Sequence, residues 1–258
     1  MCLIVFAHRA HPDYPLVLAA NRDEFFQRPT RQAHLWQDRE GSDRFIAGKD
    51  LQAGGTWLGA AFDGRFAMVT NIRDPSQTEN KPRSRGELPL QFLQGSSSPE
   101  EYAQALSPKL VEYAGFNLLI GDLENIFYIN NSERTSRRLE PGIYGLSNGL
   151  LDAPWPKIEK TRTGLERLLA AEQRPEVDSL IELMNDRQLA NDDALPDTGL
   201  PRALERQLSS PFISNTSRNY GTLCSTAVIV EKNGRLHFRE QNYDSAGNPS
   251  SGHYFRAG

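Results

Sequence analysis

The chain has 258 residues, of which 38% are apolar and 24% charged, a length and balance typical of one large folded domain or two small ones. Its formal net charge of −4 provides no basic footprint for nucleic acid or an anionic membrane surface, so we expect neither as a partner. The two cysteines, Cys2 and Cys224, are too few for a disulfide scaffold and lack the spacing of a structural zinc site.

The start of the chain lacks the features of a secretory signal. Its apolar stretch ends at His8 and Arg9, with no basic segment before it and no small-residue cleavage site after it. No apolar run approaches the roughly 18 residues that a membrane span needs. The sequence therefore predicts a cytoplasmic protein without a membrane span, in which cysteine thiols stay reduced.

The first half of the chain has the pattern of short strands joined by turns. Apolar runs over residues 3–7 and 16–20 flank a turn with two prolines and predict a hairpin that ends at the Asn-Arg-Asp-Glu run, residues 21–24. Residues 54–61 and 65–71 flank an Asp-Gly pair and predict a second hairpin. Further strands are expected at residues 116–121, 126–130, 143–147, 226–231 and 235–240.

Helical patterns occupy the centre of the chain. Ser98, Pro99 and Glu101 supply an N-cap, a first-turn proline and a glutamate at the third helical position, and predict a helix to about residue 113. A similar capping pattern begins at Ser84, although Pro89 removes an early helical N–H. Apolar spacing predicts three more helices, over residues 156–171, 176–185 and 200–208.

The order of these elements predicts the fold class. Strands come first, helices lie between, and strands return at the end, with no regular alternation of strand and helix. This order is typical of an α+β protein built on antiparallel hairpins. We expect one domain over residues 1–244 and a loosely ordered tail over residues 245–258, which are rich in glycine, serine and proline. The sequence does not indicate an oligomeric state.

Cys2 is the first candidate for chemistry, because its small side chain permits removal of Met1 ahead of it. Removal leaves a thiol and a free α-amine on one residue. An α-amine has an unperturbed pKa near about 8 and can accept the thiol proton, so this residue can supply both nucleophile and base. The alternative interpretation is a plain buried first strand that begins at Cys2.

Five motifs occur in order along the chain, namely Met1-Cys2, Asn21-Arg22-Asp23-Glu24, Gly54-Gly55-Thr56-Trp57, Ser84-Arg85-Gly86 and Tyr220-Gly221-Thr222. With this set the chain resembles the NRDE family, the family of the transport and Golgi organization 2 proteins, from residue 1 to about residue 240. That family is similar to the N-terminal-nucleophile hydrolases, near the choloylglycine hydrolases and penicillin V acylases. The resemblance implies a four-layer αββα fold, in which two stacked antiparallel sheets lie between helical layers.

The resemblance also implies roles for individual residues. Cys2 matches the nucleophile, and Asp23 matches the aspartate that holds the new α-amine. Arg22 is close by in sequence and would favour the thiolate, since a nearby cation lowers the pKa of a cysteine. Asn71 and Asn148 each follow a strand and match donors of an amide N–H to a developing oxyanion.

Two later positions complete the comparison with the family pattern. Arg218 matches a late arginine near the nucleophile. Relatives commonly carry an arginine where this chain has Leu223, so the chain departs from the pattern there and loses a charge. Any anion binding that depends on that arginine is not expected here.

Structural alternatives exist for several of these assignments. Arg22 and Asp23 can form a salt bridge that closes a strand end, and asparagine is common in turns. Cys224 begins an apolar strand and has the setting of an inert core thiol. His8 and His11 are three residues apart. Because a strand end and a turn are predicted between them, we interpret them as surface histidines rather than as ligands of a metal or haem.

Two functions therefore remain open. The first is hydrolysis of a non-peptide C–N amide bond in a small molecule, through an acyl-enzyme on Cys2 and without a cofactor. The second is a non-catalytic carrier on the same fold, because the resemblance links the family to haem trafficking and to lipid or acyl-CoA metabolism. Selectivity in either case depends on loop shapes that the sequence does not define.

Overall fold

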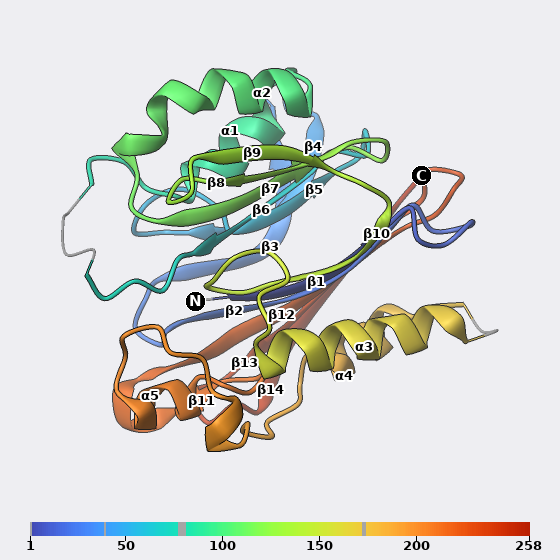
Figure 1. Ribbon diagram of the computed structural model, residues 1–258. Coiled ribbons are helices and arrows are strands. Elements are labelled where there is room, and N and C mark those ends of the chain that lie inside the picture. The colour runs from blue at the N-terminus through green and yellow to red at the C-terminus, as the bar shows by residue number, and fades with distance from the viewer. Residues whose placement is uncertain (1, 39, 77–80, 172–173) are drawn as a thin grey trace.

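The computed structural model describes residues 2–38, 40–76, 81–171 and 174–258, with only the backbone of Cys2 (Figure 1). The chain folds into two stacked antiparallel sheets with helices over their outer faces, which is the α+β, four-layer αββα arrangement that we expected. Within these ranges, no helix has the length and apolar character needed to cross a membrane.

The first sheet is built around the N-terminal hairpin. Across the sheet its strands are β10 (Gly142–Leu146), β1 (Cys2–His8), β2 (Leu16–Phe25), β12 (Tyr220–Val230), β13 (Leu236–Tyr243) and β14 (Pro249–Ala257), with the short β11 (Ser214–Asn215) paired to β12. The predicted hairpin of residues 3–7 and 16–20 is confirmed, and β2 continues through the Asn-Arg-Asp-Glu run to its end.

The second sheet is a meander in which each strand pairs with the next along the chain. Its strands are β3 (Thr30–Gln37), β4 (Asp43–Asp50), β5 (Leu58–Ala61), β6 (Phe66–Asn71), β7 (Phe116–Gly121), β8 (Ile126–Asn130) and β9 (Thr135–Leu139). The Asp-Gly turn joins β5 to β6 as predicted. Sequence patterns missed β3, β4 and β9; β3 is interrupted by register shifts and half exposed, so its side chains do not alternate cleanly.

Helices cover both outer faces. On the second sheet lie α1 (Glu87–Gln94), α2 (Pro99–Leu106) and the 3-10 turn η1 (Ser107–Glu112), and on the first lie α3 (Pro156–Ala170) and α4 (Val177–Leu183), as Figure 1 shows. The capping box of α2 is confirmed, because the Glu101 N–H donates to Ser98 Oγ at 3.3 Å and the Ser98 N–H donates to Glu101 Oε2 at 2.8 Å. Pro89 lies in the first turn of α1, where a missing N–H breaks no helical bond.

The first sheet is covered on both sides. Ile4, Phe6 and Leu18 face the second sheet, whereas Leu3 and Val5 face α3 and α4. Because both faces are buried, β1 and β2 are continuous apolar runs rather than alternating ones. Polar residues within these strands are therefore exceptions. His8, which we expected at the surface, is 2% exposed where β1 ends, and the Asn-Arg-Asp-Glu run ends β2 beside the start of β1.

The C-terminal segment corrects one expectation. Residues 245–258 were expected to be loosely ordered, but Pro249–Ala257 forms β14, which pairs with β13 along the sheet edge. Glycine and serine occur both in the preceding turn and in the first half of β14, residues 249–252, where the proline also lies. In the turn, Asp244 Oδ1 accepts the N–H groups of Ala246 and Asn248. Phe255 then packs against the core between the sheets, which anchors the strand.

Candidate active site

The motif residues meet where β1 begins. In the first sheet β2 lies between β1 and β12, so the backbone of Arg22 is paired with Cys2 on one side and Cys224 on the other. The side chain of Cys2 lies outside the described residues. Since Leu146 of β10 pairs with Ile4, the chain that follows β10 runs past the start of β1.

Two glycine motifs pack against each other above this strand end. The Thr56 N–H donates to the Gly86 carbonyl at 2.9 Å. A Cβ atom on Gly55 would lie 2.3 Å from the carbonyl carbon of Gly86, so only glycine permits this backbone approach. The contact joins the segments around residues 54–57 and 84–86, which are distant in sequence, into one wall of the site.

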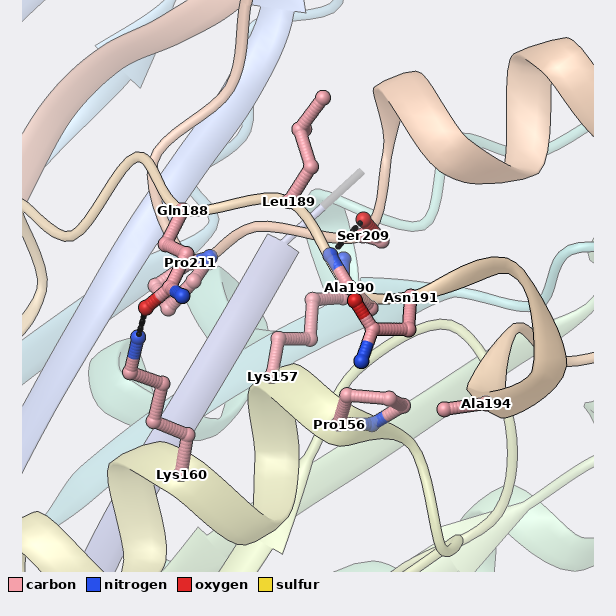
Figure 2. Close-up of a pocket in the computed structure, with 10 residues that line it drawn as sticks. All are labelled: Pro156, Lys157, Lys160, Gln188, Leu189, Ala190, Asn191, Ala194, Ser209 and Pro211. Atoms are coloured by element: carbon pink, nitrogen blue, oxygen red, sulfur yellow. Dashed lines mark hydrogen bonds between the residues drawn. The ribbon is translucent and has the colours of Figure 1, made fainter.

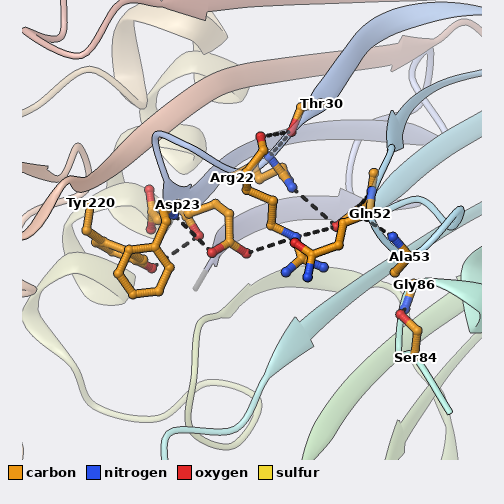
Figure 3. A network of polar contacts seen from close by, with 12 residues as sticks. Arg22, Asp23, Thr30, Gln52, Ala53, Ser84, Gly86 and Tyr220 are labelled. Carbon is orange, nitrogen blue, oxygen red and sulfur yellow. Dashed lines mark hydrogen bonds and ion pairs between the residues drawn. The ribbon is translucent and has the colours of Figure 1, made fainter.

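Arg22 faces the second sheet and is 5% exposed. Its Nη1 donates to Thr30 Oγ1 at 3.0 Å (Figure 3), its Nη2 lies 3.6 Å from Asp50 Oδ2, and its guanidinium carbon lies 4.2 Å from the ring centre of Trp57. Arg28 donates to the same Asp50 oxygen at 2.7 Å. Burial alone would raise the pKa of Asp50, but hydrogen bonds from Arg28 and the Ala53 N–H and the charges of both arginines hold it below its usual range.

Asp23 is on the opposite face of β2 and is 1% exposed. Its Oδ1 accepts a hydrogen bond from Thr222 Oγ1 at 2.7 Å, and its main-chain carbonyl accepts one from the Tyr220 hydroxyl at 3.1 Å (Figure 3). Burial raises the pKa of the Asp23 carboxyl, while the charge of Lys157 and the hydrogen bond from Thr222 act in the opposite direction. The alternative of a salt bridge between Arg22 and Asp23 is wrong, because neighbouring strand residues point to opposite faces.

The two asparagines lie together although 77 residues separate them in sequence. The buried Asn148 donates through Nδ2 to the main-chain carbonyl of Asn71 at 2.9 Å. The N–H of Arg73 donates in turn to the Asn148 carbonyl at 2.7 Å. Asn148 thus connects the segment after β10 to the end of β6, and Asn71 lines open space beside the strand ends.

Two cavities adjoin at Glu24 and Asn71, which line both. The charged cavity, of about 120 Å³, is lined further by Arg22, Asp23, Arg28, Asp50, Thr56, Trp57, Val69, Ser84, Arg85 and Gly86. The apolar cavity, of about 480 Å³, is lined further by Phe25, Leu204, Leu208, Asn215, Arg218 and Tyr220. Arg218 is thus an exposed residue of the apolar cavity, and Leu223 lies at a β-bulge of β12.

The sequence matches the family described as Transport and Golgi organisation 2 over residues 1–245. The chain belongs to this family. It is 35% identical to the Transport and Golgi organization protein 2 homolog of Bos taurus, with 94% of this chain and 93% of the relative covered. The homolog of Homo sapiens is 32% identical over the same shares of the two chains.

The fold of this Transport and Golgi organisation 2 family member is that of the N-terminal-nucleophile hydrolases. The structure is similar to a Caenorhabditis elegans N-acylethanolamine-hydrolyzing acid amidase ortholog, with a TM-score of 0.51 over 88% of this chain and 92% of that chain. Sequence identity between the two is 10%, so the likeness shows the fold alone.

The structure of the family member also reveals buried cations that sequence analysis missed. Arg73 forms a buried ion pair with Glu205, and its guanidinium carbon lies 4.8 Å from the ring centre of Trp155. Lys157 is 3% exposed, lies two residues after this tryptophan and lines a cavity together with Pro156 (Figure 2). A positive charge in the first turn of a helix interacts unfavourably with the helix dipole. This unusual position was the one feature of the sequence that could have indicated a special role for Lys157. No signal marked Arg73, whose partner is 132 residues away.

Proposed function

We propose that this protein is a cysteine N-terminal-nucleophile amidohydrolase that cleaves a non-peptide C–N amide bond through Cys2. The observation that carries the proposal is Asp23, a buried carboxylate with a 2.7 Å hydrogen bond from Thr222, at the strand end where β1 begins. A carboxylate in this setting is suited to holding an α-ammonium group, because such groups are stable in the interior only beside an opposite charge.

Catalysis begins once Met1 has been removed and the Cys2 amine has taken the thiol proton. The thiolate attacks the amide carbonyl carbon, and an amide N–H of Asn71, which Asn148 orients, stabilises the developing oxyanion. The tetrahedral intermediate collapses as the α-ammonium gives its proton to the leaving nitrogen. Water, deprotonated by the same amine, then attacks the thioester and releases the acid and the free thiol.

The charges around the strand end support this sequence of steps. Arg22, in backbone register with Cys2, supplies a fixed positive charge that favours the thiolate. Asp23 favours the protonated amine that donates to the leaving group. Because Asn148 already donates to the main chain of Asn71, we assign it mainly to orienting Asn71, which lines both cavities.

The two adjoining cavities support a substrate with unlike halves. The apolar cavity of about 480 Å³ is within the size range of small-molecule sites, and its walls suit an acyl group. The charged cavity suits the amine half, with Arg28 and Asp50 as polar contacts. Arg218, on the exposed rim, is assigned to substrate binding rather than to the bond-breaking steps.

A carrier function is the second candidate, and the same apolar cavity favours it. Phe25 and Leu208 offer apolar contact to a lipid, an acyl-CoA chain or haem without any need for Cys2. Under this function, ligand binding is saturable, is unchanged in Cys2→Ala, and is accompanied by no turnover.

The test is hydrolysis of a series of acyl p-nitroanilides of increasing acyl length by wild-type protein and by Cys2→Ala. We expect turnover by the wild type and a loss of at least about 10³-fold in kcat for Cys2→Ala, because the nucleophile is gone. Cys224→Ala is the matched control, a buried thiol whose loss should leave turnover within a few-fold of wild type. Equal turnover by Cys2→Ala and wild type would contradict the proposal.

A further inference from the structure

Several buried charges in the described part of the chain have neighbours of opposite sign, which offset the high free energy of an isolated buried charge. The geometry shows two such ion pairs, Arg73 with Glu205 and Arg22 with Asp50. Asp23 and Lys157 are likewise buried, at 1% and 3% exposure, and carry opposite charges. Their placement is the basis of a further assignment.

Both residues lie on the helix side of the first sheet. Helix α3 begins at Pro156 and packs against β1 and β10 through Ile158 and Leu165. Asn21 has the same orientation on β2 as Asp23, and its Nδ2 donates to the Pro211 carbonyl at 3.0 Å.

Pro211 and Lys157 line one cavity of about 360 Å³ on this side of the sheet. Figure 2 shows the Lys157 side chain rising from the first turn of α3 toward the segment that carries Pro211. The lysine is therefore directed at the layer in which Asn21 and Asp23 lie.

A cation at this point of the fold needs compensation. Lys157 occupies the first turn of a 15-residue helix, whose partial positive charge repels it, and burial removes its hydration. Trp155, with its ring centre 6.0 Å from Nζ, provides a weak cation–π contact at most. A carboxylate on the same side of the sheet stabilises a buried lysine, because opposite charges in the interior offset each other's loss of hydration.

We propose that Lys157 is a positioning residue of the candidate active site, whose buried ammonium neutralises Asp23 across the helix side of the sheet and keeps that carboxylate ionised where β1 begins. The catalytic consequence rests on the proposed function, because an ionised Asp23 is what holds the Cys2 amine. The charge pairing itself does not depend on any activity.

Other groups also face Asp23 within the described residues. Thr222 of β12 donates to it, and Arg73, on the segment after β6, adds a second positive charge. Burial raises the pKa of Asp23, and the positive charges of the N-terminus, Lys157 and Arg73 oppose the rise together with the hydrogen bond from Thr222. Loss of Lys157 should therefore make Asp23 take up a proton at a higher pH.

The charge pairing is tested by a double-mutant cycle of Lys157→Met and Asp23→Asn, read as the thermal midpoint at pH 7. We expect Lys157→Met alone to lower Tm by roughly 10 °C, since breaking one partner of a buried pair strands the other charge. In the Asp23→Asn background the same change should lower Tm by far less, because no charge is stranded. The double variant should therefore be more stable than Lys157→Met.

Controls keep this cycle decisive. Lys160, on the same helix as Lys157, is a half-exposed lysine that pairs with Asp186, and Lys160→Met should shift Tm little in either background. If Lys157→Met fails to fold, recovery of folding in the double variant supports the pairing. Additive losses in the cycle, or a double variant no more stable than Lys157→Met, would overturn it.

The positioning role is tested by the pH profile of kcat/KM for a p-nitroanilide that the wild type hydrolyses. We expect Lys157→Met to move the acidic limb of the profile upward by about one pH unit, and Lys157→Arg to restore it, because arginine keeps the charge. An unmoved limb in Lys157→Met would overturn the positioning role. If wild-type protein hydrolyses no amide, the proposed function fails, while the stability cycle still decides the charge pairing.

Discussion

The two faces of β2 differ sharply at its end. On the face toward the second sheet, Arg22 meets Asp50, Thr30 and Trp57 beside a cavity of about 120 Å³. On the face toward the helices, Asp23 is 1% exposed and accepts a hydrogen bond from Thr222, although it also lines that cavity. One face carries a cluster of ion pairs, and the other carries a buried carboxylate.

The difference shows how one tetrapeptide places side chains on both sides of a sheet. Because a strand alternates its side chains, the run from Asn21 to Glu24 sends Arg22 to the space between the sheets and Asp23 to the helix layer. The charge that favours a thiolate and the charge that holds an ammonium can then act from opposite sides of the same backbone. Adjacent residues in the sequence therefore have unlike environments and unlike responses to mutation.

The helix-side face should give the largest effect on activity. Asp23→Asn keeps the shape but removes the charge that holds the Cys2 amine, so we expect kcat for amide hydrolysis to fall on the order of 10³-fold. Steady-state kinetics with a matched circular dichroism spectrum measures this. A variant within tenfold of wild type would show that Asp23 has only a structural role.

The next effect is on stability, at the buried pair that links β6 to α5 (Arg202–Gln207). Arg73→Met leaves Glu205 buried and uncompensated, so the free energy of unfolding should fall by about 3–5 kcal/mol in urea titrations. Arg206, on the same helix as Glu205, forms an exposed ion pair with Asp192, and Arg206→Met should cost less than about 1 kcal/mol. Equal losses for the two variants would contradict the difference in burial.

The face between the sheets should respond more mildly. Arg22→Met removes a hydrogen bond to Thr30 and a cation–π contact with Trp57, while Arg28 still neutralises Asp50, so we expect a loss of about 1–2 kcal/mol. Arg22→Lys should recover part of it. Urea titration measures both. If Arg22→Met lowered the free energy of unfolding as much as Arg73→Met, the face between the sheets would be as inaccessible to solvent as the buried Arg73–Glu205 pair.

The smallest effect is a difference in how the stabilities of variants at Asp50 and at Asp23 depend on pH. The pKa of Asp50 is lowered in the folded state, so its ionisation stabilises the fold at pH values above its unfolded pKa of about 4. This stabilisation is lost as the pH falls through the folded pKa. The pKa of Asp23 is raised, so its contribution is present below the unfolded value and is lost as pH rises through the folded one.

Thermal melts from pH 3 to pH 8 measure this difference. The Tm penalty of Asp50→Asn should grow as pH rises above about 4, whereas Asp23→Asn should become relatively more stable over the same change. Parallel curves for the two variants would contradict the opposite pKa shifts.

Local chemistry accounts for what the sequence could predict. The turn at residues 63–64 and the capping box of Ser98 depend on neighbours within a few residues, and both are present as expected. The β14 strand was missed because proline and glycine, which are depleted in strands, occur in its first half. Among the site residues, the pairing of Asn71 with Asn148 and the burial of Lys157 depend on packing between distant segments, which no local pattern encodes.

The most direct test of the central claim is the intact mass of untagged protein, before and after brief exposure to an activated acyl ester and an acid quench. The account predicts a mass short of Met1 and a single added acyl group on the peptide that begins with Cys2. Retention of Met1 in all molecules, with no acyl group on Cys2, would contradict it, since a blocked amine cannot serve as the base.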